Sequence, residues 1–204
     1  MSKEGRQKHE PSEDDKKQFL SLLEPVLPKL GRFALALTRE REEARDLVSE
    51  SIQLAFEHFH NVREPQAFIS YLFTIARRLY YNQRKRRAIW LPWSKEADER
   101  SHDPGPGIDA KLDCEALDRA LLLIPEKQRE AVILFEISEL SLEEVRKIQG
   151  GALSGVKSRI ARGRAQLAAI LGDSEIQSGT GHRETTGEPK PTHAPMAYII
   201  AERL

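Results

Sequence analysis

The sequence has one cysteine, Cys114, few aromatic residues (6%) and no net charge, since 32 Lys and Arg balance 32 Asp and Glu. A single cysteine excludes an intramolecular disulfide and is typical of a reducing compartment. Few aromatic residues beside 31% charged residues argue against a β-sandwich and favour a highly charged helical protein. Because the charges balance, the chain is not a uniformly basic protein of the kind that coats nucleic acids. Any contact with a nucleic acid must come from local clusters of charge.

Long apolar runs and catalytic motifs are also missing. No run approaches the roughly 20 apolar residues that a membrane-spanning helix needs, and residues 1–15 are polar and lack the apolar stretch of a signal peptide. We therefore expect a cytoplasmic chain without membrane insertion. The sequence contains no glycine-rich phosphate loop, no metal-spaced Cys/His set and no nucleophile motif. We accordingly expect no enzyme activity, no cofactor and no metal site.

What the chain does contain is apolar residues at helical spacing, with little of the alternation expected of strands. The spacing predicts helices over about 19–37, interrupted at Pro25 and Pro28, and over about 42–59 and 66–87. Residues 91–112 are acidic and include Pro and Gly, which predicts a flexible linker. The predicted fold is all-α. It has two small helical domains at 13–90 and 113–172, a disordered lead over 1–12 and a mostly disordered extension over 173–204.

The second predicted domain contains a helix-turn-helix pattern. Residues 141–144 match a capping box, the capped helix ends at Gly150 and Gly151, and a basic helix follows. With Val156 and Ile160 facing inward, the polar residues of the outward stripe and its flanks are Ser154, Lys157, Ser158, Arg159, Arg162 and Arg164. Lys and Arg neutralise phosphates, and Ser or Arg can read base edges. The same pattern also fits a solvated basic face on an ordinary helical hairpin.

Four segments of the chain, in order, resemble the extracytoplasmic-function (ECF) family of sigma factors. Residues 44–50 (ARDLVSE) resemble the family's polymerase-clamp-binding helix, and residues 71–78 (YLFTIARR) resemble its promoter-melting helix. Residues 124–130 (IPEKQRE) are similar to the lead-in helix of its minus-thirty-five-reading domain, and residues 142–160 to that domain's helix-turn-helix. The resemblance covers about 12–172, and four matches in order are more specific than any one.

The resemblance implies a bacterial alternative sigma factor, which binds RNA polymerase core and directs promoter recognition and melting. It implies promoter DNA and an anti-sigma factor as further partners, and a monomer when free. The core-binding face would comprise Asp46, Ser49, Glu50 and Gln53, although the family usually has Gln at the position of Ser49.

Melting requires aromatic stacking of bases and cations on phosphates. By the resemblance, this surface would comprise Arg77, Arg78, Tyr80, Tyr81, Arg84, Lys85, Arg86 and Arg87. At least one of the tyrosines is expected in the core, because the neighbouring Leu79 must face inward. The loop 60–64 would shape a pocket for a flipped base. Asn61 and Arg63 are its candidate contacts, and the sequence does not decide between them and Val62.

The second domain departs from the family pattern in ways that predict modest stability, or tightening only on polymerase or DNA. Its unusual residues are Arg146, Gln149, Gly151, Ala152, Gly155 and Gly163. Each glycine inside a helix costs roughly 0.5–1 kcal/mol relative to Ala, and a lost N-cap costs on the order of 1 kcal/mol. Ser154 is a possible substitute cap that would start the helix later.

Two other functions fit parts of the sequence. A sigma-like module that sequesters an anti-sigma factor without initiating transcription would explain the altered helix-turn-helix, but it would not need the run of cations from Arg84 to Arg87. A one-component DNA-binding regulator would not explain the polymerase-binding pattern. For the extension, either a frayed tail or docking of its apolar end (Met196, Ile199, Ile200 and Leu204) fits the sequence.

Overall fold

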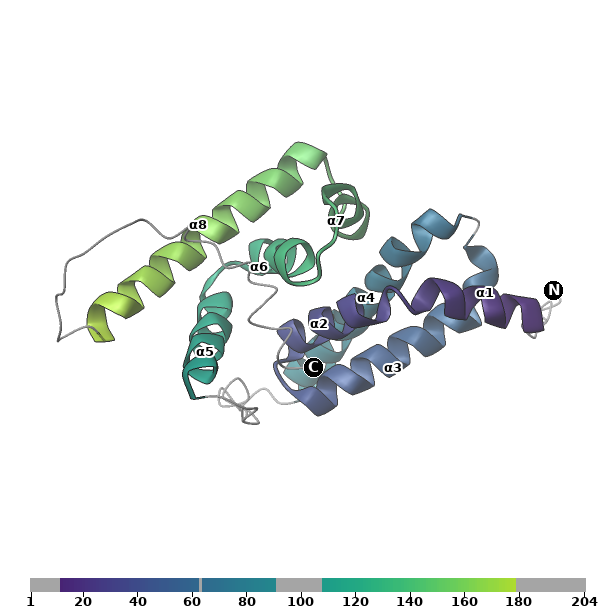
Figure 1. Cartoon of the computed structure of the whole chain (residues 1–204), viewed down its shortest axis with the longest axis horizontal. Helices are drawn as coiled ribbons and strands as arrows, with labels where there is room; N and C mark the ends of the chain where they lie inside the picture. Colours follow the sequence, from purple (N-terminus) through teal and green to yellow (C-terminus); the bar gives the residue numbers. More distant parts are fainter. Residues whose placement is uncertain (1–11, 63, 91–107, 179–204) are drawn as a thin grey trace.

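The computed structural model describes residues 12–62, 64–90 and 108–178, and contains helices and no strand within these ranges (Figure 1). The first bundle comprises α1 (Glu13–Leu23), α2 (Leu27–Thr38), α3 (Arg41–Glu57) and α4 (Phe68–Trp90), with short 3-10 turns at Phe59–Asn61 and Pro65–Ala67. The second bundle comprises α5 (Ile108–Leu123), α6 (Glu126–Val132), a π-helical turn (Ile133–Ile137), α7 (Leu142–Gln149) and α8 (Leu153–Ser178).

Local sequence signals set the starts of α1, α2 and α7. Ser12 and Asp15 form a capping box on α1, with the Asp15 N–H donating to Ser12 Oγ at 3.1 Å and the Ser12 N–H donating to Asp15 Oδ2 at 2.9 Å. The predicted break falls between α1 and α2, and Pro28 lies in the first turn of α2. The predicted capping box of α7 is confirmed, since the Ser141 N–H donates to Glu144 Oε2 at 2.7 Å.

The first bundle packs around aromatic side chains. The ring of Phe19 makes edge contacts with the rings of Phe56, Phe59 and Phe68 at centroid distances of 5.0, 5.2 and 5.4 Å. Of the apolar residues at helical spacing between Phe19 and Leu37, those at 19, 23, 26, 30, 33, 34 and 37 are buried, whereas Leu27 is exposed. The break after α1 resets the helical phase, so the inward stripe of α2 starts at Leu30 instead.

The second bundle is longer at both ends than the sequence predicted. Helix α5 begins at Ile108, inside the predicted linker, and α8 continues to Ser178, six residues past Gly172. Residues 1–11, most of the predicted linker and 179–204, including the apolar end of the extension, lie outside the described residues.

A π-helical turn that the sequence did not predict joins α6 to α7. The Ser138 N–H donates to the Ile133 carbonyl, five residues back, at 2.9 Å, and Ser138 Oγ donates to the same carbonyl at 3.0 Å. Glu139 then adopts a positive φ of 54°, which turns the chain sharply into α7.

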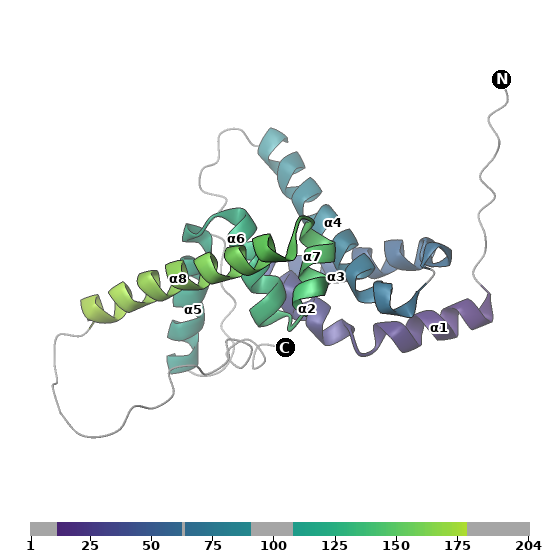
Figure 2. The same cartoon turned by 90° about the horizontal axis from the view of Figure 1, so that it is seen from above.

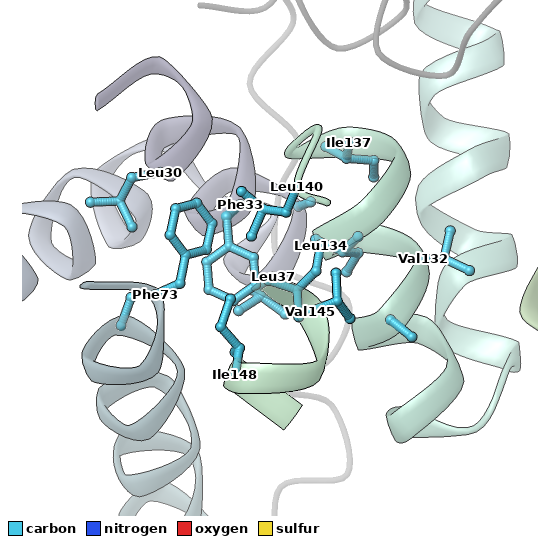
Figure 3. Packing of buried hydrophobic residues seen from close by; sticks show 14 of the residues in the cluster. Leu30, Phe33, Leu37, Phe73, Val132, Leu134, Ile137, Leu140, Val145 and Ile148 are labelled. Atoms are coloured by element: carbon cyan, nitrogen blue, oxygen red, sulfur yellow. The ribbon is translucent and has the colours of Figure 1, made fainter. Parts of the chain in front are cut away.

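The two bundles share one core, whereas the sequence suggested domains linked only by a tether. Phe33 of α2 and Phe73 of α4 are fully buried, and they belong to the same apolar cluster as Leu134, Val145 and Ile148 of the second bundle (Figure 3). Figures 1 and 2 show α6 and α7 beside the first bundle, while the far end of α8 extends away from it. We call this contact between the bundles the interbundle interface.

Candidate nucleic-acid interface

The basic half of α4 presents cations to solvent. Arg78, Arg84, Lys85, Arg86 and Arg87 are all exposed. Two of them are also held by neighbouring side chains. Arg84 Nη1 donates to the Tyr80 hydroxyl at 3.3 Å, and Arg87 pairs with Glu43 of α3 at 2.6 Å. The result is a cationic edge on the C-terminal half of α4, suited to phosphates.

Tyr80 packs against the first bundle, and its hydroxyl meets the cationic edge only through Arg84. Its hydroxyl donates to the Leu37 carbonyl at 3.0 Å, so it fastens α4 to the end of α2. Neither tyrosine is fully buried, but Tyr80 packs against the core, as the sequence suggested for at least one of the two. As a base-stacking residue Tyr80 is poorly placed, because its ring is half-buried against the apolar residues Ala34, Leu35 and Leu47.

Arg77 and Tyr81 lie one turn apart on α4 and face the second bundle. The guanidinium of Arg77 is 5.3 Å from the centre of the Tyr81 ring, and it forms an ion pair with Glu130 of α6. Burial raises the pKa of the Tyr81 hydroxyl above its ordinary value, and the nearby carboxylate of Glu130 raises it further, while Arg77 opposes both effects. These two predicted DNA-binding residues are thus engaged at the interbundle interface.

The loop that the resemblance assigns to a flipped base is only partly described. Asn61 ends the first 3-10 turn, and the Val62 N–H donates to the Phe59 carbonyl at 2.8 Å. Arg63 lies outside the described residues. On α4, shortly after this loop, the Tyr71 hydroxyl is buried without a hydrogen-bond partner, and burial raises the pKa of Tyr71.

The predicted polymerase-binding residues Asp46, Ser49, Glu50 and Gln53 are all exposed on α3. Gln83 of α4 donates to Glu50 at 2.9 Å, and Gln53 donates to Glu57 at 3.1 Å. These residues form a polar face on the side of α3 away from its buried residues Ala44, Leu47 and Ala55.

Helices α7 and α8 form the predicted helix-turn-helix. Gly150 and Gly151 have positive φ values of 77° and 90°, which a glycine adopts without strain. Helix α8 begins at Leu153, and the Ala152 carbonyl accepts the first helical bonds from the N–H groups of Gly155 and Val156. Ala152 is therefore the N-cap residue. The prediction of a later start capped by Ser154 is wrong, because Ser154 lies inside the first turn.

The predicted DNA-reading residues of α8 differ in exposure. Ser154, Lys157 and Arg162 are exposed, whereas Ser158 and Arg159 are half-buried. Arg159 Nη2 donates to the Gly150 carbonyl at 3.1 Å, which ties the helix to the turn before it. Arg164 is exposed, but it pairs with Glu136, and its guanidinium lies 5.5 Å from the centre of the Phe135 ring.

Glu130 and its partner Gln149 are site residues that sequence reasoning missed. Glu130 is almost fully buried; it accepts hydrogen bonds from Arg77 and, at 2.7 Å, from Gln149 Nε2 of α7. The available signal was Gln149, a polar residue where the family usually has an apolar one. In the described part of the chain, no group of three or more His, Cys, Asp or Glu could hold a metal, and no helix has the length and apolarity to cross a membrane.

Comparisons with known proteins agree with this architecture. The family model for Sigma-70 region 2 matches residues 22–89, and that for Sigma-70, region 4 matches residues 114–167. The chain is 32% identical over 146 residues to the ECF RNA polymerase sigma factor EcfG of Rhodopseudomonas palustris, a match that covers 72% of this chain and 81% of that protein. The chain belongs to the ECF sigma factors.

Solved structures support the same assignment. The sigma factor RpoE of Bartonella quintana, in a crystal with the anti-sigma factor NepR, has a TM-score of 0.67 and 31% identity, covering 76% of this chain and 98% of that one. CnrH, in complex with the cytosolic domain of CnrY, has a TM-score of 0.61 at 20% identity and shows the fold alone. This chain is thus an alternative sigma factor that directs promoter recognition, with region 2 in its first bundle and region 4 in its second.

The structure explains two departures of this sigma factor from the family pattern. Arg146 does not wedge between helices, because its guanidinium pairs with Glu143 on the same helix at 2.7 Å. Gln149 donates to the Lys127 carbonyl at 3.2 Å as well as to Glu130, so it joins α7 to α6 by polar contacts.

Proposed function

We propose that this sigma factor docks on RNA polymerase core through the exposed face of α3, holds the melted minus-ten strand along the cationic edge of α4, and reads the minus-thirty-five element with α8. The docking residues are Asp46, Ser49, Glu50 and Gln53. Lys157 and Arg162 are the strongest candidates on α8, because both are exposed and neither has an ion-pair partner among the described residues. Ser154 can add a base-edge contact.

The cationic edge of α4 carries this proposal most directly. Five exposed cations within ten residues of one helix concentrate positive charge in a chain whose net charge is zero. Such an edge neutralises the phosphates of a separated strand. A module that only sequestered an anti-sigma factor would not require it.

Partners and place of action follow from the same proposal. We infer that it acts in the bacterial cytoplasm, where the polymerase works, by binding and without a catalytic step of its own. The complex of the Bartonella relative with NepR supports an anti-sigma factor as a further partner. Such a partner would have to cover the face of α3 or the helix-turn-helix to block initiation.

Run-off transcription tests the proposal. Purified protein is added to sigma-free core polymerase on a genomic promoter library at low salt, where phosphate contacts are strongest. We expect specific transcripts, which disappear when residues 84–87 are all replaced by Ala. The Lys16→Ala, Lys17→Ala variant removes exposed cations of α1 and should leave the transcripts unchanged.

The assay also separates the proposed function from the sequestering module. Core binding without transcripts, or no core binding, would contradict the proposal and favour a protein that titrates an anti-sigma factor. Separately, Lys157→Ala should weaken minus-thirty-five binding across sequences and reduce the slope of log affinity against log salt by about one.

A further inference from the structure

Among the residues that the structure describes, Glu130 stands out as a carboxylate with only 1% of its surface exposed. Burying a charge is costly unless it is paired and hydrogen-bonded. Here one carboxylate oxygen accepts from Arg77 of region 2 and the other from Gln149 of region 4. The partner that neutralises this buried charge therefore comes from the other bundle.

This contact occupies part of the surface that the proposed function gives to promoter DNA. Arg77 cannot neutralise a phosphate while it pairs with Glu130. Tyr81 is half-buried, and the Arg77 guanidinium covers one face of its ring, which a base would need for stacking. The remaining cations of α4, from Arg84 to Arg87, stay exposed.

Further polar contacts hold the rim of the interbundle interface. Arg32 of α2 donates from Nε to the Ile137 carbonyl at 2.8 Å and pairs with Glu139 at 3.1 Å. Lys29 donates to the Glu139 carbonyl at 3.0 Å. These cations meet carbonyls at the C-terminal end of the π-helical turn, where the helix dipole favours positive charge. The apolar contact of Phe33 and Phe73 with the second bundle belongs to the same interface (Figure 3).

We propose that the interbundle interface is an autoinhibitory latch, in which Glu130 of region 4 masks Arg77 and Tyr81 of region 2 until polymerase core and promoter DNA separate the bundles. The inference rests on the proposed function of α4. The exposed face of α3 takes no part in the latch, so polymerase core can dock while the bundles are still together.

The spacing of the promoter elements requires the latch to open. The minus-ten and minus-thirty-five elements lie roughly 25 base pairs apart, which is about 85 Å on a duplex that advances about 34 Å per turn of 10 base pairs. In the latched arrangement α4 packs directly against α7 of the helix-turn-helix. One molecule cannot hold both elements in that arrangement.

The Glu130→Gln variant of the full chain tests the latch, because it removes the charge and keeps the size of the side chain. Binding to a fluorescein-labelled 20-nucleotide poly(dT) is measured by anisotropy at low salt without polymerase, since stacking surfaces accept any base. We expect the variant to bind about tenfold tighter or more, since a hydrogen bond to a charged group contributes at least that factor to the closed state.

The matched control is Glu143→Gln, which makes the same charge change in the same bundle but breaks only the pair with Arg146 inside α7. Its affinity for the oligonucleotide should equal that of the wild type. Equal tightening by both variants would assign the effect to net charge and overturn the latch. If Glu130→Gln does not fold, Arg32→Gln removes the rim contacts instead, with the same expected direction.

A distance measurement tests the arrangement itself, whatever the chain binds. Spin labels at Arg45→Cys on α3 and Gln166→Cys on α8, with Cys114→Ser, report the separation of the bundles by pulsed electron resonance. We expect the wild type to show one narrow distribution of distances between the two labels. In Glu130→Gln this distribution should broaden and shift to longer distances, whereas in Glu143→Gln it should not change. A broad wild-type distribution would overturn the inference. Failure of run-off transcription alone would overturn the proposed function and leave this distance result standing.

Discussion

Gly163 lies where α8 crosses α6, and its lack of a side chain permits the close approach of the two helices. A Cβ at this position would lie 2.6 Å from Val132 Cγ2 and 3.3 Å from the Gln128 carbonyl oxygen. The sequence pattern counts this glycine only as a cost to the helix. In the structure, the same glycine is what lets the DNA-reading helix pack on α6, so the cost is offset by packing.

Replacing Gly163 and Gly155 by Ala should therefore have opposite effects. Gly163→Ala should destabilise the protein by about 1–3 kcal/mol through overpacking against Val132. Gly155→Ala should stabilise it by about 0.5–1 kcal/mol, because nothing lies within 4 Å of the added methyl group and the helix gains propensity. Urea denaturation followed by circular dichroism measures both. If both variants gain stability, the close-packing account of Gly163 is wrong.

Tyr81 offers a residue-level report on the interbundle interface. Burial first and Glu130 second raise its pKa above the ordinary value of 10, so the neutral phenol is favoured in the folded state. Its contribution to stability is thus complete below pH 10 and is lost as the pH rises further.

We expect the Tyr81 hydroxyl to titrate later than a free tyrosine when followed by the NMR shift of its ring Cζ. In Glu130→Gln the midpoint should fall, because the carboxylate is gone and the ring becomes more exposed to water. Glu143→Gln should leave it unchanged. A Tyr81 that titrates like a free phenol in the wild type would contradict its burial between the bundles.

Among the elements, α8 begins without a side-chain cap. Ala152 occupies the N-cap position, where Ser accepts a hydrogen bond from a free N–H of the first turn. Ala152→Ser should stabilise the protein by about 1 kcal/mol, measured by urea denaturation. The control Ala168→Ser places the same hydroxyl at an exposed position within α8 and should be neutral or slightly destabilising. Equal effects at both positions would exclude capping as the cause.

The helix ends that depend on residues close by in the sequence could be predicted from it. The capping residues of α1 and α7, the proline break before α2 and the glycine turn before α8 depend on neighbours within a few residues. Family resemblance then gave the order of the functional segments. Its assignment of the exposed residues on α3, α4 and α8 stays a prediction.

The π-helical turn and the interbundle interface could not be predicted in the same way. The π-helical turn arises from a backbone bond across five residues, and the carbonyl of its last residue, Ile137, accepts from Arg32, 105 positions away. Phe73 packs against Phe33 of α2, with ring centres 5.1 Å apart, and belongs to the same buried cluster as residues of the second bundle. The helical periodicity of the sequence gave it no such role. Arg77 was assigned to DNA because basic residues surround it, while its partner Glu130 lies on another helix.

At the scale of the whole molecule, the shared core links the stability of region 4 to that of region 2. Phe33 and Phe73 cover Leu134, Val145 and Ile148, which would face water if the second bundle stood alone (Figure 3). Gln149 would keep its bond to Glu130, but the carboxylate would lose Arg77. The glycines and the missing cap predicted modest stability for the isolated second bundle. The structure adds a further cause, because the isolated bundle would also lose its contacts with the first bundle.

The segment 108–178 should accordingly be less protected alone than within the full chain. Hydrogen exchange of the α7 and α8 amides measures this difference, and we expect protection to fall by about tenfold or more, since burying even one large apolar side chain contributes about 1.5–3 kcal/mol. The protection of these amides in the full-length Glu130→Gln variant should lie between that of the segment and that of the wild type, because the variant weakens the interface without removing region 2. Equal protection in the segment and the full chain would mean that the bundles are energetically independent, and that separating them costs the polymerase nothing.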